Sequence, residues 1–161
     1  MKKLIIIRHA KSSWEHNVED LKRPISNRGY TDSQIMSGIF NNLDIKVDAI
    51  FSSHSKRTMQ TAQVFHNNLP YSSNLSIIKS IDLYDFSGNM VDVFVKQINN
   101  QFDNVMIFTH NNSCNRLISD YGGISNIHVP TTGILIFQFD VYLWSEIIKG
   151  KCNYYFPKSF K

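Results

Sequence analysis

The sequence predicts an α/β fold in which helices cover both faces of a mostly parallel sheet, a three-layer α/β/α sandwich. Short aliphatic runs alternate with segments whose apolar residues recur at helical spacing, which is typical of βαβ units. The last two aliphatic runs have no helix between them and predict a late antiparallel strand pair. Of 161 residues, 42% are hydrophobic and 19% charged, so we expect one globular domain over residues 1–161.

The first half of the chain predicts two strands and two helices. A buried strand is expected over Leu4–Ile7, because this run is wholly aliphatic. A helix follows, with Ser26 as a suitable N-cap and an apolar face that continues through residues 35–43. The second strand is expected over Val47–Phe51 and the second helix over Met59–Leu69.

The second half continues the same alternation. In order, we expect a strand, a helix, a strand and a helix over Leu75–Ile78, Val91–Ile98, Val105–Phe108 and Leu117–Tyr121. The glycine pair that follows ends the last of these helices. The final strand pair is expected over Ile134–Phe139 and Leu143–Ile148, with a turn between them.

Composition excludes several classes of protein. The net charge of +4 comes from scattered lysines, which is too diffuse to indicate a nucleic-acid partner. No apolar run has the length of a membrane span or a signal-peptide core, so we expect no membrane partner and a cytoplasmic location. Cys114, Cys152 and the six histidines show no metal-binding spacing. We therefore expect no metal and no cofactor.

Arginine and histidine side chains follow three of the predicted strands where each strand ends. Arg8 and His9 come directly after the first strand. Arg57 follows the second strand, and His110 follows the fourth. Because the carboxyl ends of parallel strands share one edge of a sheet, these side chains can meet in one pocket. Guanidinium groups bind phosphate oxygens, and a neutral imidazole can attack phosphorus, so the residue types predict phosphoryl transfer.

Four segments, in the same order, also resemble a known family. They are Arg8–Trp14, Arg23–Gly29, Ser52–Ala62 and Thr109–Asn111, and together they resemble the motifs of the histidine phosphatase (phosphoglycerate mutase-like) superfamily. Ala10 stands where that superfamily usually has glycine, and this is closer to the small SixA-type phosphohistidine phosphatases. The resemblance implies a phosphoglycerate mutase-like fold. Glu15 stands where mutase-like members often carry asparagine, which argues against mutase activity.

The resemblance implies a role for each matching residue. His9 would be the nucleophile that becomes phosphorylated. The residues that bind the phosphoryl oxygens would be Arg8, Arg57 and His110. The residues that bind substrate at the mouth of the pocket would be Lys11, Ser12 and Arg23. Fixed cations would neutralise the phosphate, so no metal would be needed.

The residue that would act as the general acid is not assigned by these motifs. Asp85, in a loop after the third predicted strand, is the preferred candidate. The other carboxylates in suitable positions are Asp82, Glu15, Glu19 and Asp20. SixA-type enzymes resemble this chain in lacking an obvious acid. The P–N bond of phosphohistidine is labile and depends less on an acid than an alkyl ester does.

Chain length favours the same substrate. Two helices and two strands use nearly all the residues between Arg57 and His110, which leaves none there for a lid. An open pocket suits a phosphorylated side chain that another protein presents. We therefore predict a metal-independent phosphatase that removes phosphate from phosphohistidine in a protein. Two alternatives remain: a phosphatase of small phosphate esters, and a non-catalytic module that binds phosphoproteins.

Overall fold

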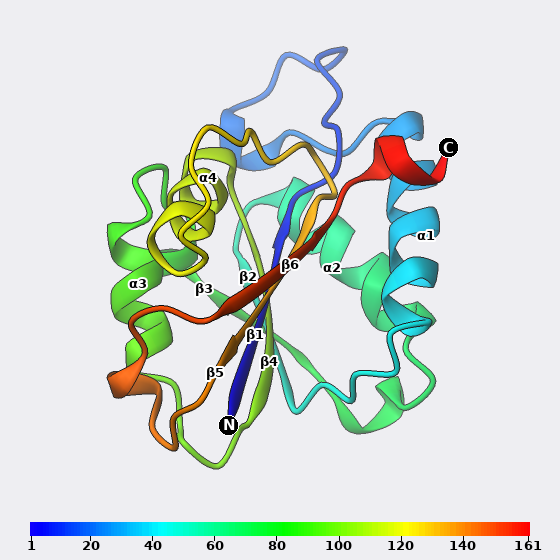
Figure 1. The fold of residues 1–161 in the computed structure, drawn as a ribbon. Helices are drawn as coiled ribbons and strands as arrows, with labels where there is room; N and C mark the ends of the chain where they lie inside the picture. Colours follow the sequence, from blue (N-terminus) through cyan, green and yellow to red (C-terminus); the bar gives the residue numbers. More distant parts are fainter.

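A computed structural model describes residues 1–161 and confirms the predicted α/β architecture (Figure 1). Its ten main elements are β1 (Lys2–Arg8), α1 (Asn27–Asn41), β2 (Ala49–Ser53), α2 (Lys56–Asn68), β3 (Ile77–Ser80), α3 (Asn89–Lys96), β4 (Asn104–Thr109), α4 (Asn111–Asp120), β5 (Ile134–Phe139) and β6 (Lys151–Tyr155). The strand order is β3-β2-β4-β1-β5-β6. The first four strands in that order pair in parallel, whereas β5 and β6 are antiparallel to their neighbours. None of the helices has the length and apolar character that a membrane span requires.

The central strand β1 contributes to two separate cores, one on each face of the sheet. Leu4 and Ile6 pack with α3 and α4 on one face, while Ile5 and Ile7 pack with α1 and α2 on the other. All four side chains are fully buried. This alternation follows from the two-residue period of a strand, and it explains why the run is aliphatic at every position.

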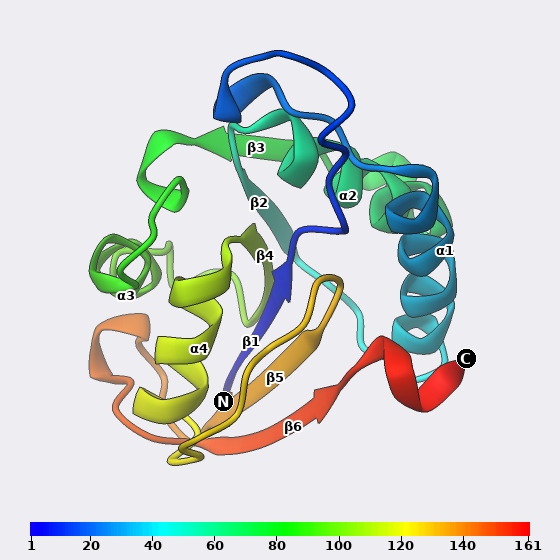
Figure 2. The same ribbon diagram turned by 90° about the horizontal axis from the view of Figure 1, so that it is seen from above.

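The connections that follow β1, β2 and β4 lie along one edge of the sheet. The longest of them joins β1 to α1 and passes over the carboxyl ends of the strands (Figures 1 and 2). Its base is held together by an isolated bridge between Ser12 and Ile25. Helix α1 approaches so closely that a Cβ on Gly29 would lie 2.2 Å from the carbonyl oxygen of Lys11. Only glycine fits there, and the contact fixes the base of this connection.

The last strand lies in a different segment from the one the sequence predicts. Residues 143–148 contain a short 3₁₀ turn, Trp144–Glu146, and β6 follows only at Lys151. Trp144 and Ile147 are buried while Leu143 and Ile148 are exposed, so burial recurs every three residues, as it does in a helical turn. The Trp144 indole donates a hydrogen bond to the carbonyl oxygen of Phe102. The prediction of an antiparallel pair is confirmed, but its second segment was wrong.

Candidate active site

His9 lies at the end of β1 with its tautomer fixed by two contacts. Its Nδ1 lies 2.8 Å from the backbone carbonyl oxygen of Ala10, which can only accept a hydrogen bond. The Nε of Arg57, which can only donate, lies 3.3 Å from the Nε2 of His9. Nδ1 therefore carries the proton, and Nε2 presents its lone pair.

The charge state of His9 follows from its surroundings. The side chain is only 8% exposed. Burial lowers the pKa of His9 to about 3, and the nearby guanidinium charges, with Arg57 the strongest, act in the same direction. The imidazole is therefore neutral at physiological pH, which is the form that can act as a nucleophile.

Arg57 is the centre of the site. It lies in the first turn of α2, which begins after Ser55, whose side chain caps the helix. Its guanidinium donates to Nε2 of His9 at 3.3 Å and to Nδ1 of His110 at 3.3 Å. The side chain is 2% exposed. A buried cation at a helix N-terminus opposes the helix dipole, so Arg57 is costly as a structural residue and suited to bind an anion.

His110 completes the buried cluster from the end of β4. Because Nδ1 of His110 accepts from Arg57, its Nε2 carries the proton and donates to the hydroxyl of Ser53 at 2.9 Å. Burial lowers the pKa of His110 to about 2, with the neighbouring His9 adding to the effect. The rings of His9 and His110 lie 5.3 Å apart between centroids. The structure thus brings together the side chains that follow β1, β2 and β4.

Arg8 is held by the loop before β5. Its guanidinium donates to the carbonyl oxygen of Val129 at 2.8 Å and lies 3.3 Å from Nε2 of His128. Its Nε is buried and has no hydrogen-bond partner within the protein. The same loop bends back at Thr132, a β-branched residue with φ of 58°, whose backbone N–H donates to the carbonyl oxygen of Arg8. Such strain in a β-branched residue is typical of functional sites.

The connection between β1 and α1 covers the cluster. Asp20 accepts hydrogen bonds from Arg57 through both its backbone oxygen (2.7 Å) and its carboxylate (3.0 Å). The same carboxylate accepts from Arg23 at 2.6 Å and from the hydroxyl of Tyr84 at 2.5 Å. The expectation of an open pocket was wrong. The covering residues come mostly from the segment before α1, and Tyr84, from the segment between Arg57 and His110, is bonded to them through Asp20.

The predicted substrate-binding residues take two different positions. Arg23 is buried and donates to the hydroxyl of Ser12. Its guanidinium carbon lies 3.8 Å from the centroid of the Trp14 ring, which stacks on it. Arg23 and Ser12 are thereby linked to Arg57 through Asp20. Lys11 has an exposed side chain, and its backbone carbonyl contacts α1.

Asp85 is surrounded in a way that does not suit the predicted general acid. Its carboxylate accepts hydrogen bonds from the backbone and hydroxyl of Ser87 and from the backbone N–H groups of Met90 and Val91. Burial would raise the pKa of Asp85, but these hydrogen bonds lower it below its ordinary value. The carboxylate is ionised and anchors the start of α3, so it has no proton to donate.

Two further residues support the cluster although the motifs did not single them out. The Thr61 hydroxyl accepts from the backbone N–H of Ala10 at 2.9 Å and donates to the backbone oxygen of Arg57 at 2.7 Å. Ser53 accepts from His110. Both lie in the segment Ser52–Ala62, and Thr61 is one helical turn after Arg57. That spacing was the signal that could have found it.

Comparison with known proteins identifies the family. The model of the histidine phosphatase superfamily (branch 1) matches residues 4–88, which include His9 and Arg57. The chain belongs to this superfamily. It is a phosphatase enzyme with the phosphoglycerate mutase-like fold.

Solved structures agree with this fold. A protein histidine phosphatase SixA complexed with tungstate has a TM-score of 0.79 at 18% identity, and the alignment covers 99% of each chain. A protein from Agrobacterium tumefaciens described as a phosphohistidine phosphatase SixA has a TM-score of 0.75 at 18% identity, over 85% of this chain and 91% of that one. An α-ribazole phosphatase from Shigella flexneri has a TM-score of 0.69 at 14% identity, over 88% and 92%. No curated protein sequence matches.

Proposed function

We propose that this phosphatase transfers the phosphoryl group to His9 and then to water, and that its substrate is phosphohistidine in a protein. The observation that carries the proposal is the state of His9. Two independent contacts place the proton on Nδ1 and leave the Nε2 lone pair beside Arg57. A nucleophile needs an unprotonated nitrogen, whereas a residue that only binds phosphate does not.

The first step forms a bond between Nε2 of His9 and phosphorus and breaks the bond from phosphorus to the leaving group. The leaving nitrogen or oxygen keeps the electron pair of that bond and takes up a proton from water. Arg57 and the unpartnered Nε of Arg8 supply hydrogen bonds to the phosphoryl oxygens. In a buried site such fixed donors stabilise the charge of the transition state without reorganisation.

The second step restores the enzyme. Water attacks phosphorus, the P–N bond to Nε2 of His9 breaks, and inorganic phosphate leaves. The Nδ1 hydrogen bond to Ala10 persists through both steps and keeps the ring in one orientation. Arg57 contacts both histidine rings and can hold the transferred group in each step.

The carboxylates near the site favour phosphohistidine over an alkyl ester. Asp85 is ionised at the start of α3. Partial burial would raise the pKa of Asp20, but hydrogen bonds from Tyr84 and the two guanidinium groups hold it well below its ordinary value. Neither carboxyl carries a proton at neutral pH. A P–N bond tolerates this lack of an acid better than an alkyl P–O bond does.

The structural neighbours are consistent with this choice. One SixA structure is complexed with tungstate, a tetrahedral oxyanion like phosphate. The α-ribazole phosphatase shows that the same fold also serves small phosphorylated molecules. A small ester is therefore the alternative substrate to test.

The test compares His9→Ala and Asp85→Asn with the parent enzyme on two substrates, a phosphohistidine-bearing protein and an alkyl phosphate. The parent should prefer phosphohistidine, and His9→Ala should lose more than about 1,000-fold in turnover of both substrates. Asp85→Asn should change both rates by the same factor, because Asp85 supports a loop. Full activity of His9→Ala would contradict the proposal. A loss confined to the alkyl phosphate in Asp85→Asn would restore Asp85 as the acid and favour the ester.

A further inference from the structure

The cluster of His9, Arg57 and His110 has an aromatic side that the mechanism above does not use. Phe86 lies in the loop before α3, and its ring centroid is 4.8 Å from that of His110, at an angle of 44°. The Tyr84 ring packs against both, 5.2 Å from His110 and 4.9 Å from Phe86, in edge-to-face geometry. We call Tyr84 and Phe86 the aromatic wall.

Phe86 contributes little to the core. Its side chain is 48% exposed, although it lies against a histidine that is 1% exposed. Exposure alone does not single out Phe86, because other large apolar side chains of this protein are exposed as well, but Phe86 is one that also contacts the buried cluster. Phe86 is absent from both hydrophobic cores. Its exposed face is therefore available for a ligand.

The loop that carries the wall is held rigidly. The Asp85 carboxylate caps α3, and the backbone oxygen of Asp85 accepts from the Ser113 hydroxyl at 2.6 Å. One residue earlier, the Tyr84 hydroxyl donates to Asp20. Asp85 thus lies between the two aromatic residues and fixes both. A preorganised surface of this kind loses little entropy when a ligand binds.

The position of the aromatic wall determines which part of a bound substrate lies against it. A phosphoryl group bound between His9, Arg57 and His110 has these buried side chains on its inner side, so its leaving group must project away from them. Phe86 is the exposed side chain in direct contact with His110. We therefore expect the leaving group of the substrate, and not its phosphoryl oxygens, to contact the Phe86 ring.

We propose that Phe86 is a specificity-determining residue which recognises the imidazole ring of phosphohistidine by ring-to-ring contact as the leaving group. This inference rests on the proposed function. Planar rings pack on one another in offset or edge-to-face geometry and gain more than their buried area provides, whereas a small leaving group such as ammonia makes no such contact. The wall therefore favours a ring-bearing leaving group.

The test uses two phosphoramidates that differ only in the leaving group: phosphoimidazole, which releases a ring, and phosphoramidate itself, which releases ammonia. Phe86→Ala should lower kcat/KM for phosphoimidazole about 3- to 10-fold and leave that for phosphoramidate within about 2-fold. Phe86→Tyr keeps a ring and should retain the preference. Tyr142→Ala removes an exposed ring far from the pocket in the fold, in the β5–β6 connection, and should change neither rate.

The outcomes separate the two proposals. If Phe86→Ala leaves the ratio of the two kcat/KM values unchanged, whether or not both fall, the role of Phe86 is overturned and the proposed function is not. A parent enzyme that hydrolyses neither compound would overturn the proposed function and this inference with it. A selective loss in Phe86→Ala that Phe86→Tyr restores supports the inference.

Discussion

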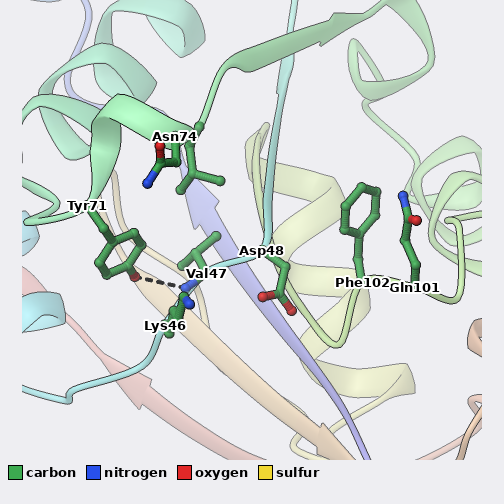
Figure 3. A pocket seen from close by; sticks show the side chains of 8 residues that line it. Lys46, Val47, Asp48, Tyr71, Asn74, Gln101 and Phe102 are labelled. Atoms are coloured by element: carbon green, nitrogen blue, oxygen red, sulfur yellow. Dashed lines mark hydrogen bonds between the residues drawn. The ribbon is translucent and has the colours of Figure 1, made fainter.

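The two edges of the sheet differ in how their polar groups are satisfied. At the amino ends of β2, β3 and β4 lies a cavity of about 540 Å³ (Figure 3). Tyr71 in that cavity donates to the backbone oxygen of Ile45 and accepts from the N–H of Val47, and Asp48 accepts from two backbone N–H groups. These groups already have backbone partners.

At the carboxyl edge the polar side chains bond mainly to one another. Three side chains that are costly to bury, His9, Arg57 and His110, lie together and are 8%, 2% and 1% exposed. They are joined by contacts of 3.3 Å, and the neighbouring Arg8 keeps a buried N–H without a partner. Proteins retain such arrangements where chemistry requires them. The comparison teaches that buried polar groups mark this site better than the size of a cavity does.

The largest expected difference between the two edges comes from removing one cation at each of them. Arg57→Ala should lower kcat/KM by more than about 100-fold, because it removes a fixed donor to the transferred group. Lys46→Ala, at the amino edge, should stay within about 2-fold of the parent. Arg57→Lys keeps the charge but not the planar fork, and should still lose more than about 10-fold. Steady-state kinetics of the three variants, with thermal melts as a check on folding, measure this. Comparable losses at both edges would remove the distinction.

The second effect is the dependence of stability on pH. The folded-state pKa of His9 is about 3, below the ordinary value of 6.5. Between these values the unfolded chain binds a proton that the folded protein does not, so stability falls as pH falls from about 6.5 towards 3. His9 should contribute about 1.4 kcal/mol per pH unit in this window.

Urea unfolding at several pH values tests this contribution. His9→Gln should show a shallower loss of stability between pH 6.5 and 4.5 than the parent. His54→Gln is a useful control, because His54 lies outside the cluster and contacts Tyr84 instead. Equal slopes in the parent and His9→Gln would mean that His9 titrates normally in the folded protein.

A smaller effect is expected at Asp20, whose carboxylate shares Arg57 and Arg23 with any bound phosphate. Its side chain is 45% exposed, so the ion pairs are partly screened. Asp20→Asn should tighten competitive inhibition by inorganic phosphate about 2- to 5-fold, because one competing negative charge is lost. Asp120→Asn breaks a comparable exposed ion pair with Arg116 and is the matched control. Weaker inhibition by phosphate in Asp20→Asn would show that Asp20 positions Arg57 instead.

The smallest effect is expected in the amino-edge cavity. Asn74→Ala, which trims a side chain that lines it, should leave kcat and KM within about 2-fold. Measurement on phosphohistidine and on an alkyl phosphate covers both candidate substrates. A selective change in either would show that this cavity communicates with the carboxyl edge.

The sequence predicted most of the fold because its strands and helices are strongly periodic. Ser26 caps α1 as expected, and the elements from β1 to β5 overlap the predicted runs, although β2 and β3 each begin two residues later and α4 begins at Asn111. The position of β6 was not predictable from apolar residues, because this edge strand is held by backbone pairing with β5 and needs no apolar pattern. The run Leu143–Ile148 predicts a strand from its apolar residues, but its buried residues recur every three positions, as they do in a 3₁₀ turn.

The site was predictable to the extent that residue type reveals it. Arginine and histidine at strand ends indicated which side chains meet. The sequence could not show that Asp85 caps α3, since that depends on where the N–H groups of Met90 and Val91 point. Nor could it show that Asp20 reaches Arg57 across 37 residues of chain. Such contacts depend on tertiary packing and leave no local pattern.

The most direct test of the account is to locate the phosphoryl group during turnover. The parent enzyme is mixed with phosphoramidate, quenched in alkali, in which phosphohistidine persists, and digested for peptide mass spectrometry. The account predicts one phosphoryl group on the N-terminal peptide, assigned by fragmentation to His9, and none in His9→Ala. A phosphoryl group on another residue, or continued turnover with His9 unmodified at every time point, would contradict it.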